Sequence, residues 1–302
     1  MVGGVRMSRT KIKETKNDKV FNFTVAALLI LVNIIMLYPF IYVVSVSISN
    51  PSSVVRGEVV LLPKGFSLEA YKQILNYPYF VKSYMNTIFY ATIGTMLTLL
   101  MTVLAAYPLS MEKFRSKGTI SFLYVFTMFF SGGMIPTFLV IKNLNLLDTR
   151  SAVVVTSILS AWNIIICRSF FQGIPKSLHE SAYIDGANDW TILFRIILPL
   201  SKPVISTLAL FSIVGFWNDF FSALLYLNDR NKFPLLMILR NILINSEMIA
   251  KEPGAARDVS NTISTLSLKT ASIMVTIIPV LCVYPFIQKY FVKGAMIGSI
   301  KG

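Results

Sequence analysis

The sequence predicts an all-α protein that crosses a membrane six times. The chain has 302 residues, of which 55% are hydrophobic and 14% are charged, and its mean hydropathy is +0.67. In a typical soluble domain, about a quarter of all residues are charged. Charged residues are nearly absent from six apolar blocks. Most of these blocks are close in length to the roughly 20 residues that a helix needs to cross the hydrocarbon. Because backbone groups in lipid must be paired within the segment, we expect these blocks to be helices.

The six blocks follow one another along the chain with polar segments between them. The first block is far longer than the apolar stretch of about 7–15 residues in a secretory signal, so we expect it to be retained as a span. The fourth block is short and lies between Arg150 and Arg168. The predicted spans are Phe21 to Val46, Thr87 to Ser110, Thr119 to Ile141, Ser151 to Cys167, Pro203 to about Tyr226, and Thr270 to Gln288.

The basic residues predict the orientation of the spans. They are dense in the tail of residues 1–20 and in the short loop after the second span, which carries Lys113, Arg115 and Lys117. Loops rich in lysine and arginine stay on the cytoplasmic side. We therefore expect a cytoplasmic N-terminus, followed by one six-helix transmembrane domain over residues 21–302.

This topology assigns the long segments between the spans to the two sides of the membrane. The loop of about residues 175–200 lies inside, and the segments of about 47–86 and 227–269 lie outside. The second outer segment carries Pro253 and Gly254 and mixed charge. It is expected to be either a solvated loop or a contact surface for an extracellular partner, and the sequence leaves both open.

Several function classes are excluded by the sequence. The net charge of +14 suggests nucleic acid, but the basic residues lie in short clusters between apolar blocks, where they act as topology signals. Cys167 and Cys282 fall inside apolar blocks and His179 is the single histidine, so neither a disulfide framework nor a metal site is expected. The sequence contains no phosphate-binding G-x-x-x-x-G-K-[ST] motif. We expect no catalytic residue, no metal and no cofactor in this chain, which is therefore not an enzyme.

The inner loop carries the clearest pattern in the chain. Ser177 is expected to cap a short helix, with Glu180 completing a capping box. Gly186 permits a tight turn or a close approach by another backbone. A second amphipathic piece, Trp190 to Ile197, is expected to end at Leu198-Pro199, because proline breaks a helix. A loop so ordered and so apolar should bury one face against another cytoplasmic protein.

This loop resembles a known motif. It reads Glu-Ser-Ala-x-x-Asp-Gly-Ala, then eight residues, then Ile-x-Leu-Pro, which is similar to the EAA loop of permease subunits from type I ABC importers. Ser181 stands where that family has alanine. The resemblance implies a MetI-like permease fold whose coupling helix sits in a cleft of an ATPase, with Glu180 as polar anchor and Gly186 as the turn. The residues that it assigns to ATPase coupling are Glu180, Ser181, Ala182, Asp185, Gly186, Ala187, Leu198 and Pro199.

Further motifs are similar to the carbohydrate branch of that family, the maltose-type permeases. They are Asn86-Thr87, Ser131 to Pro136, Leu144 to Thr149, Trp217 to Phe220 and Lys293 to Gly302. The resemblance implies a multi-pass subunit of a bacterial inner membrane that carries a sugar or oligosaccharide. The implied partners are a second, homologous permease in a heterodimer, two ABC ATPases that bind ATP and Mg²⁺, and an extracellular solute-binding protein. The chain itself contacts membrane lipid and no nucleic acid.

Aromatic and planar polar residues in the spans are candidates for the substrate pathway, since sugars are bound by aromatic faces and by groups that pair with hydroxyls. These candidates are Trp217, Asn218, Asp219, Tyr226, Asn163 and Asn86. A carboxylate within a span is costly unless it faces water or a partner. The alternative is that the aromatic residues anchor helices at the interface and that the asparagines join helices.

Two other functions stay open from the sequence. The first is a solute other than a sugar on the same importer scaffold. The second is an ion-coupled secondary carrier that acts alone, although the span interiors show none of the chains of Asp, Glu and His that proton-coupled carriers use.

Overall fold

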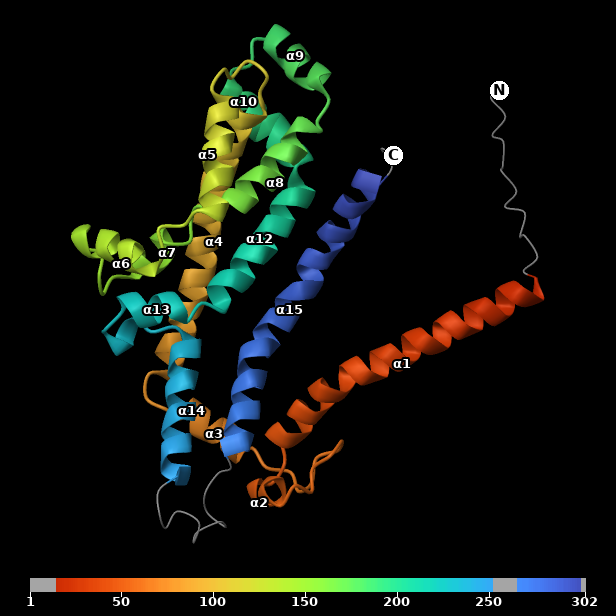
Figure 1. The fold of residues 1–302 in the computed structure, drawn as a ribbon, viewed down its shortest axis with the longest axis vertical. Coiled ribbons are helices and arrows are strands. Elements are labelled where there is room, and N and C mark those ends of the chain that lie inside the picture. Colours follow the sequence, from red (N-terminus) through yellow and green to blue (C-terminus); the bar gives the residue numbers. More distant parts are fainter. Residues whose placement is uncertain (1–14, 252–264, 300–302) are drawn as a thin grey trace.

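The computed structural model describes residues 15–251 and 265–299, and all regular elements within them are helices apart from one isolated bridge between Ser49 and Phe66. Three long helices run beside one another along the long axis of the molecule, while the first helix diverges from them (Figure 1). The three are α4 (Phe80–Ser110), α12 (Lys202–Trp217) and α15 (Thr265–Ser299), and the diverging helix is α1 (Lys16–Ser47).

Three of the predicted spans lie within helices that are long and apolar enough to cross a membrane. They are the first in α1, the second in α4 and the sixth in α15. The second helix begins at Phe80, seven residues before the predicted Thr87, and so reaches into the expected outer segment. The apolar surface of α1 is almost wholly exposed within the chain, as expected for a helix that lies in lipid.

The third predicted span is bent, and the fifth is interrupted between Trp217 and Phe221. Residues 119–141 form α5 (Lys117–Phe129) and α6 (Met134–Asn143), which meet at 115°. Gly133 takes a φ of +86° at this bend, a conformation that favours glycine. The fifth span begins within α12, which ends at Trp217, and the 80° bend between α12 and the preceding helical segment, residues 189–200, lies just before this span. The short α13 (Phe221–Tyr226) follows.

The fourth predicted span is wrong as a single helix. It consists of α7 (Arg150–Val155) and α8 (Ala161–Gln172), separated at residues 156–160. Ser160 caps α8 by accepting a hydrogen bond from the Asn163 amide at 3.3 Å. At about 1.5 Å per residue, the 12 residues of α8 are shorter than the hydrocarbon is thick. Non-helical backbone at such a depth has to be covered by protein or line a wet cavity.

Several of the segments between the spans lie at the two ends of the molecule (Figure 1). The expected inner loop forms α9 (Lys176–Ile184) and α10 (Asp189–Ile192) at one end. The expected outer segments form α2 (Pro51–Val55), α3 (Glu69–Leu75) and α14 (Leu235–Lys251) at the other.

The second outer segment is not a solvated loop in its first half. Helix α14 packs against α4 and α15, and its apolar residues recur at helical spacing. Leu235, Ile238 and Ile242 are buried there, together with Leu268 and Ala271 of α15. Residues 252–264 lie outside the described residues.

Helix α4 packs against a side chain of α12 at a glycine. A Cβ atom placed on Gly94 would lie 2.6 Å from the ring of the buried Phe216. The absence of a side chain on Gly94 leaves room for this ring, and small residues at helix contacts are common in membrane proteins. This contact fixes the position of α12 against α4, and the polar cavity described below lies between these helices.

The Asp148 cluster, which consists of Asp148, Asn228, Asp229 and Lys232, ties the turn after α13 to the start of α7. The Asp148 carboxylate accepts hydrogen bonds from the amides of Asn228 and Asp229 at 3.1 and 3.0 Å, and from the Lys232 ammonium at 3.1 Å. These donors, with the Asp229 amide first, lower the pKa of Asp148 below its ordinary value.

Replacing Asp148 with alanine is expected to loosen this turn. The substitution leaves two backbone donors and one ammonium without their acceptor, and hydrogen bonds to a charged group are worth about 1.5–3 kcal/mol each when buried and less at this half-exposed site. Amide exchange at Asn228 and Asp229 should accelerate at least about tenfold, because each 1.4 kcal/mol is a factor of ten. Asp148→Asn is the matched control, since asparagine accepts one such bond and tolerates the φ of +56° found here.

The same cluster predicts a pH dependence. Because the native pKa of Asp148 is lowered, its stabilisation is fully present above the ordinary aspartate pKa of about 3.9 and is lost as the pH falls through the native value. Protection of these amides should therefore be constant between about pH 5 and 7. Loss of protection already at pH 5 would contradict this assignment.

Candidate functional site

The inner loop is built around a tight turn at Gly186. Helix α9 ends at Ile184, and Gly186 follows with a φ of +78°. The Gly186 amide donates to the Tyr183 carbonyl at 3.0 Å, and the Ala187 amide donates to the Ala182 carbonyl at 2.9 Å. This pair of bonds is the Schellman arrangement, in which a glycine in the left-handed conformation ends a helix. The turn lets α10 begin directly after α9, and the two helices form a compact unit.

One face of this unit is anchored in the protein. Ala182 is buried, as are Ile192, Leu193 and Ile197, which follow the turn. They pack in a core with Val103 and other residues of α4 and α8. Asn188 caps α10 by accepting a hydrogen bond from the Thr191 amide at 2.8 Å. The unit is therefore held on the helical body and is not a free linker.

The opposite face of the unit exposes large apolar side chains. Ile184 is 87% exposed, Trp190 is 61% exposed and Phe194 is 50% exposed. The rings of Trp190 and Phe194 stack with centroids 6.1 Å apart. We call Ile184, Trp190 and Phe194 the apolar tip. Apolar groups exposed on an ordered element that extends beyond the bundle are typical of a surface that another protein covers.

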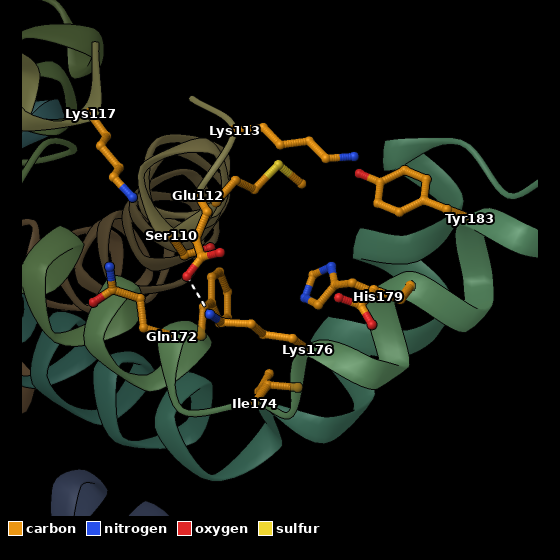
Figure 2. Close-up of a pocket in the computed structure, with 12 residues that line it drawn as sticks. Ser110, Glu112, Lys113, Lys117, Gln172, Ile174, Lys176, His179 and Tyr183 are labelled. Atoms are coloured by element: carbon orange, nitrogen blue, oxygen red, sulfur yellow. Dashed lines mark hydrogen bonds and ion pairs between the residues drawn. The ribbon is translucent and has the colours of Figure 1, made fainter. Parts of the chain in front are cut away.

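A pocket of about 320 Å³ separates α9 from the end of α4 (Figure 2). Glu112, after α4, forms an ion pair with Lys176 at the start of α9. The Lys113 ammonium lies 4.8 Å from the centroid of the Tyr183 ring. Both partners of the ion pair are well exposed, so the pair contributes little stability and mainly orients α9. Glu180 also lines this pocket.

The side chains of α9 are also held by aromatic contacts. His179 stacks on Tyr107 with centroids 6.4 Å apart, and desolvation lowers the pKa of His179. The Tyr183 hydroxyl donates a hydrogen bond to the Asp189 carboxylate, which raises the pKa of Tyr183 to about 12. At neutral pH the tyrosine is therefore a hydrogen-bond donor.

Two local predictions for this loop are wrong. Ser177 does not cap α9, because the helix begins one residue earlier and its N-cap is Pro175. The second piece does not end at Leu198-Pro199 but continues to Leu200 through a π-helical stretch, Leu193–Ile197, and the short α11 (Leu198–Leu200). The wide π turn before Pro199 gives its ring room that a regular helix denies.

Three of the predicted pathway residues are used in internal contacts. Asn86 is buried and donates to the carbonyls of Asn231 and Phe233 at 2.7 and 3.1 Å. The buried Trp217 donates from its indole to the Thr276 carbonyl of α15 at 3.1 Å.

Tyr226 is buried as well, and it stacks on Phe138 at 6.3 Å. A fourth candidate, Asn218, is exposed and donates to the Val214 carbonyl of its own helix at 3.0 Å. The alternative that the asparagines make internal contacts describes Asn86, whereas the packing of Trp217 and Tyr226 inside the protein differs from the interfacial anchoring expected of them.

The two remaining candidates share one cavity. Asn163 at the start of α8 and Asp219 after α12 both line a cavity of about 410 Å³ between α4, α8, α12 and α13. Thr98 of α4 and Ser212 of α12 line it as well. These two hydroxyls could not be singled out from the sequence, because serine and threonine recur along both spans.

Other functional contacts were also missed from the sequence. Arg168 donates to the Ser121 hydroxyl at 2.8 Å and joins α8 to α5, and Lys176 pairs with Glu112 across 64 positions of the chain. Long-range pairs of this kind have no local signal. Among the described residues, no group of three or more His, Cys, Asp or Glu side chains is placed to hold a metal ion.

Comparison with known families and proteins gives consistent matches. Residues 92–296 match the family model described as binding-protein-dependent transport system inner membrane component. The chain is 43% identical over 290 residues to the polygalacturonan/rhamnogalacturonan transport system permease protein YtcP of Bacillus subtilis, with 94% of this chain and 99% of that protein covered. It is 25% identical over 291 residues to the diacetylchitobiose uptake system permease protein NgcG of Streptomyces coelicolor, covering 94% and 91% respectively.

A solved structure has the same fold. It is a chain in the crystal structure of a bacterial ABC transporter involved in the import of the acidic polysaccharide alginate, with a TM-score of 0.82 and 36% sequence identity. The likeness covers 93% of this chain and 99% of that chain.

Proposed function

Because the chain belongs to the family of binding-protein-dependent transport system inner membrane components, we propose that it carries a saccharide across the membrane for an ABC importer and receives its driving force through α9 and α10. The chain is the permease subunit of such a system and not an enzyme. Hydrolysis of ATP, with its Mg²⁺, takes place on a partner subunit.

The observation that carries this proposal is the pairing of an anchored face with an exposed apolar tip in the inner loop. The anchored face joins the tip to the core that holds α4, α8 and α12. A partner that binds Ile184, Trp190 and Phe194 can therefore move these helices as a rigid body rather than deform a loop. Two ATPase subunits that close on ATP would transmit their motion in this way and alternate the opening of the pathway.

The saccharide substrate is supported by the named relatives. The printed names of two of them refer to polygalacturonan/rhamnogalacturonan and to diacetylchitobiose, and the solved structure concerns alginate. We assign this chain the same broad class, a sugar or oligosaccharide delivered by an extracellular solute-binding protein. Within the chain, the cavity that holds Asn163 and Asp219 is the part of the pathway that suits a sugar.

The remaining partners and the orientation follow from the same scheme. A second, homologous permease completes the pathway as a heterodimer, and two ABC ATPases dock on the inner face. The N-terminus lies in the cytoplasm with the ATPases, in keeping with the basic residues of the tail and of the loop after α4. The residues assigned to docking are Glu180, Ser181, Asp185, Gly186, Ala187, Leu198 and Pro199, and Ala182 supports them from the anchored face.

Charge reversal at Glu180 is expected to uncouple ATP hydrolysis from uptake. Glu180 is exposed on α9, and a basic residue of the ATPase paired with it would meet a like charge in Glu180→Lys. The measurement is saccharide uptake and ATP hydrolysis by the complete complex in proteoliposomes. Uptake should fall at least about tenfold, as expected for the loss of a desolvated charge pair worth about 2 kcal/mol or more.

The matched control reverses another exposed glutamate at the other end of the molecule, Glu69→Lys in α3, and should leave coupling unchanged. Undiminished uptake in Glu180→Lys would remove the docking role of this residue. Uptake by vesicles that hold this chain without any ATPase would favour an ion-coupled carrier instead.

A further inference from the structure

Two interrupted helices meet at one polar cavity. The break between α7 and α8 and the break between α12 and α13 both border the cavity of about 410 Å³, through Ser160 on one side and Asp219 on the other. Broken helices within a membrane are tolerated where their free backbone lines a cavity, and transporters place solute sites at such breaks. The breaks therefore indicate a place that a polar solute occupies.

Polar atoms at this cavity are buried without a partner. Thr98 and Ser212 are at least nine-tenths buried, and neither hydroxyl has a hydrogen-bond partner among the residues that the structure describes. One oxygen of Asp219 accepts from the Ser222 amide at 3.0 Å, while the other is buried and has no partner within 15–251 and 265–299. Buried polar atoms are normally paired, so a concentration of unpaired ones in one hollow points to a ligand or to water that pairs with them.

The lining fits the surface of a neutral sugar. Asp219 is a charged acceptor for hydroxyl groups, and Thr98, Ser212 and Asn163 can each donate and accept. The Phe211 and Phe216 rings, which also line the cavity, supply apolar surface for the carbon face of a sugar ring. A volume of about 410 Å³ lies within the range of about 300–1,000 Å³ typical of small-molecule pockets.

The charge of the lining argues against a carboxylate at this position. Among the described residues that line the cavity, none is basic, and Asp219 is the one charged side chain. Two like charges about 4 Å apart at a partly buried site repel enough to lower affinity roughly a thousandfold. A uronic acid would therefore have to direct its carboxylate away from Asp219.

We infer that this cavity is a saccharide subsite of this subunit that binds the hydroxyl face of a neutral sugar residue and rejects a carboxylate there. The inference rests on the proposed function, since it specifies which chemical face of the transported saccharide the chain contacts. It assigns Asp219 as the selective group, with Thr98 and Ser212 as hydroxyl partners.

A thiol-protection experiment on the complete complex tests this inference. Cys167 and Cys282 are first replaced by serine, and a cysteine is introduced by Ser157→Cys, at an exposed residue that lines the cavity. Labelling by a small hydrophilic thiol reagent is then measured with a galactose disaccharide or with the galacturonic acid disaccharide. The neutral disaccharide should protect at a concentration at least about tenfold lower than the acidic one. Gln73→Cys, on an exposed position of α3 outside the cavity lining, should be labelled without protection.

Asp219→Asn in the same background makes the test specific. Exchanging a charged acceptor for a neutral one should raise the protecting concentration of the neutral disaccharide about tenfold. The protecting concentrations of the neutral and the acidic disaccharide should then lie closer together. No labelling of Ser157→Cys, no protection by either sugar, equal protection by both, or an unchanged response in Asp219→Asn would overturn the inference. Uptake by the unmodified complex is measured in parallel, because failure of all saccharide uptake would refute the proposed function, whereas uptake without selective protection would refute the subsite alone.

Discussion

Replacing Gly186 with valine is expected to abolish most coupled transport while leaving the protein in the membrane. Gly186 holds a φ of +78°, and the Schellman turn between α9 and α10 depends on it. A β-branched residue in this conformation costs about 2 kcal/mol or more, which would reduce the population of the correct turn roughly thirtyfold. The measurement is the ratio of solute moved to ATP hydrolysed in proteoliposomes that contain the complete complex.

Asparagine is the matched control at this position. It adopts positive φ more readily than other residues with side chains, and a Cβ at Gly186 would meet nothing within 4 Å in the described part of the chain. If the backbone turn alone matters, Gly186→Asn should retain most of the coupling that Gly186→Val loses. Equal loss in both variants would instead indicate that the ATPase approaches the Gly186 backbone closely. Full coupling in Gly186→Val would contradict the assigned role of the turn.

Placing a carboxylate on the apolar tip should have the second large effect. Ile184 is 87% exposed, so Ile184→Glu removes almost no contact within this chain. In a complex, the same change forfeits about 1.5–3 kcal/mol from burial of the isoleucine and adds the cost of a buried, unpaired charge. The affinity for the ATPase subunit should fall at least about a hundredfold, which can be measured by titrating the ATPase onto membranes that hold the permease.

The control for this substitution is Leu62→Glu. Leu62 is 72% exposed and lies in the segment between α2 and α3, at the opposite end of the molecule. Leu62→Glu should leave ATPase binding unchanged, and both variants should reach the membrane in equal amounts. Tight ATPase binding by Ile184→Glu would show that the apolar tip is not the docking face.

The long helices were predictable from composition, but their interruptions were not. A stretch such as Ser151 to Cys167 carries no charge, and its break at residues 156–160 holds only small hydroxyl and aliphatic residues. The breaks are stabilised by single side chains, such as Ser160 capping α8 and Asp219 accepting from Ser222. Single polar residues of this kind also occur in unbroken spans, so they give no usable signal alone.

Residues 235–251 show a different limit of prediction from sequence. Their helical periodicity was present in the sequence, but the basic and polar residues around them led to the prediction of an outer loop. Tertiary contacts with α4 and α15 decide that this segment is a packed helix. The turn at Gly186 could be predicted, because glycine has a specific conformational role that a local pattern reveals.

The pathway candidates also could not be separated by sequence alone into residues that make internal contacts and residues that line the cavity. Asn86 and Asp219 looked alike in the sequence, as single polar residues near the ends of spans. In the structure, Asn86 accepts a hydrogen bond from Arg150 at 2.8 Å and is fully engaged, whereas Asp219 keeps a buried oxygen unpaired within the described chain. Only the positions of the partners, set by residues far away in the chain, distinguish a helix-joining residue from a site residue.

The most direct test of the docking of α9 and α10 on an ATPase is a cross-link from position 184. With Cys167 and Cys282 replaced by serine and Ile184→Cys introduced, the complete complex in membranes is treated with a short thiol cross-linker. The account predicts a cross-link to the ATPase subunit and labelling of position 184 from the cytoplasmic side alone. An active complex in which position 184 reacts from outside, or never joins the ATPase, would contradict it.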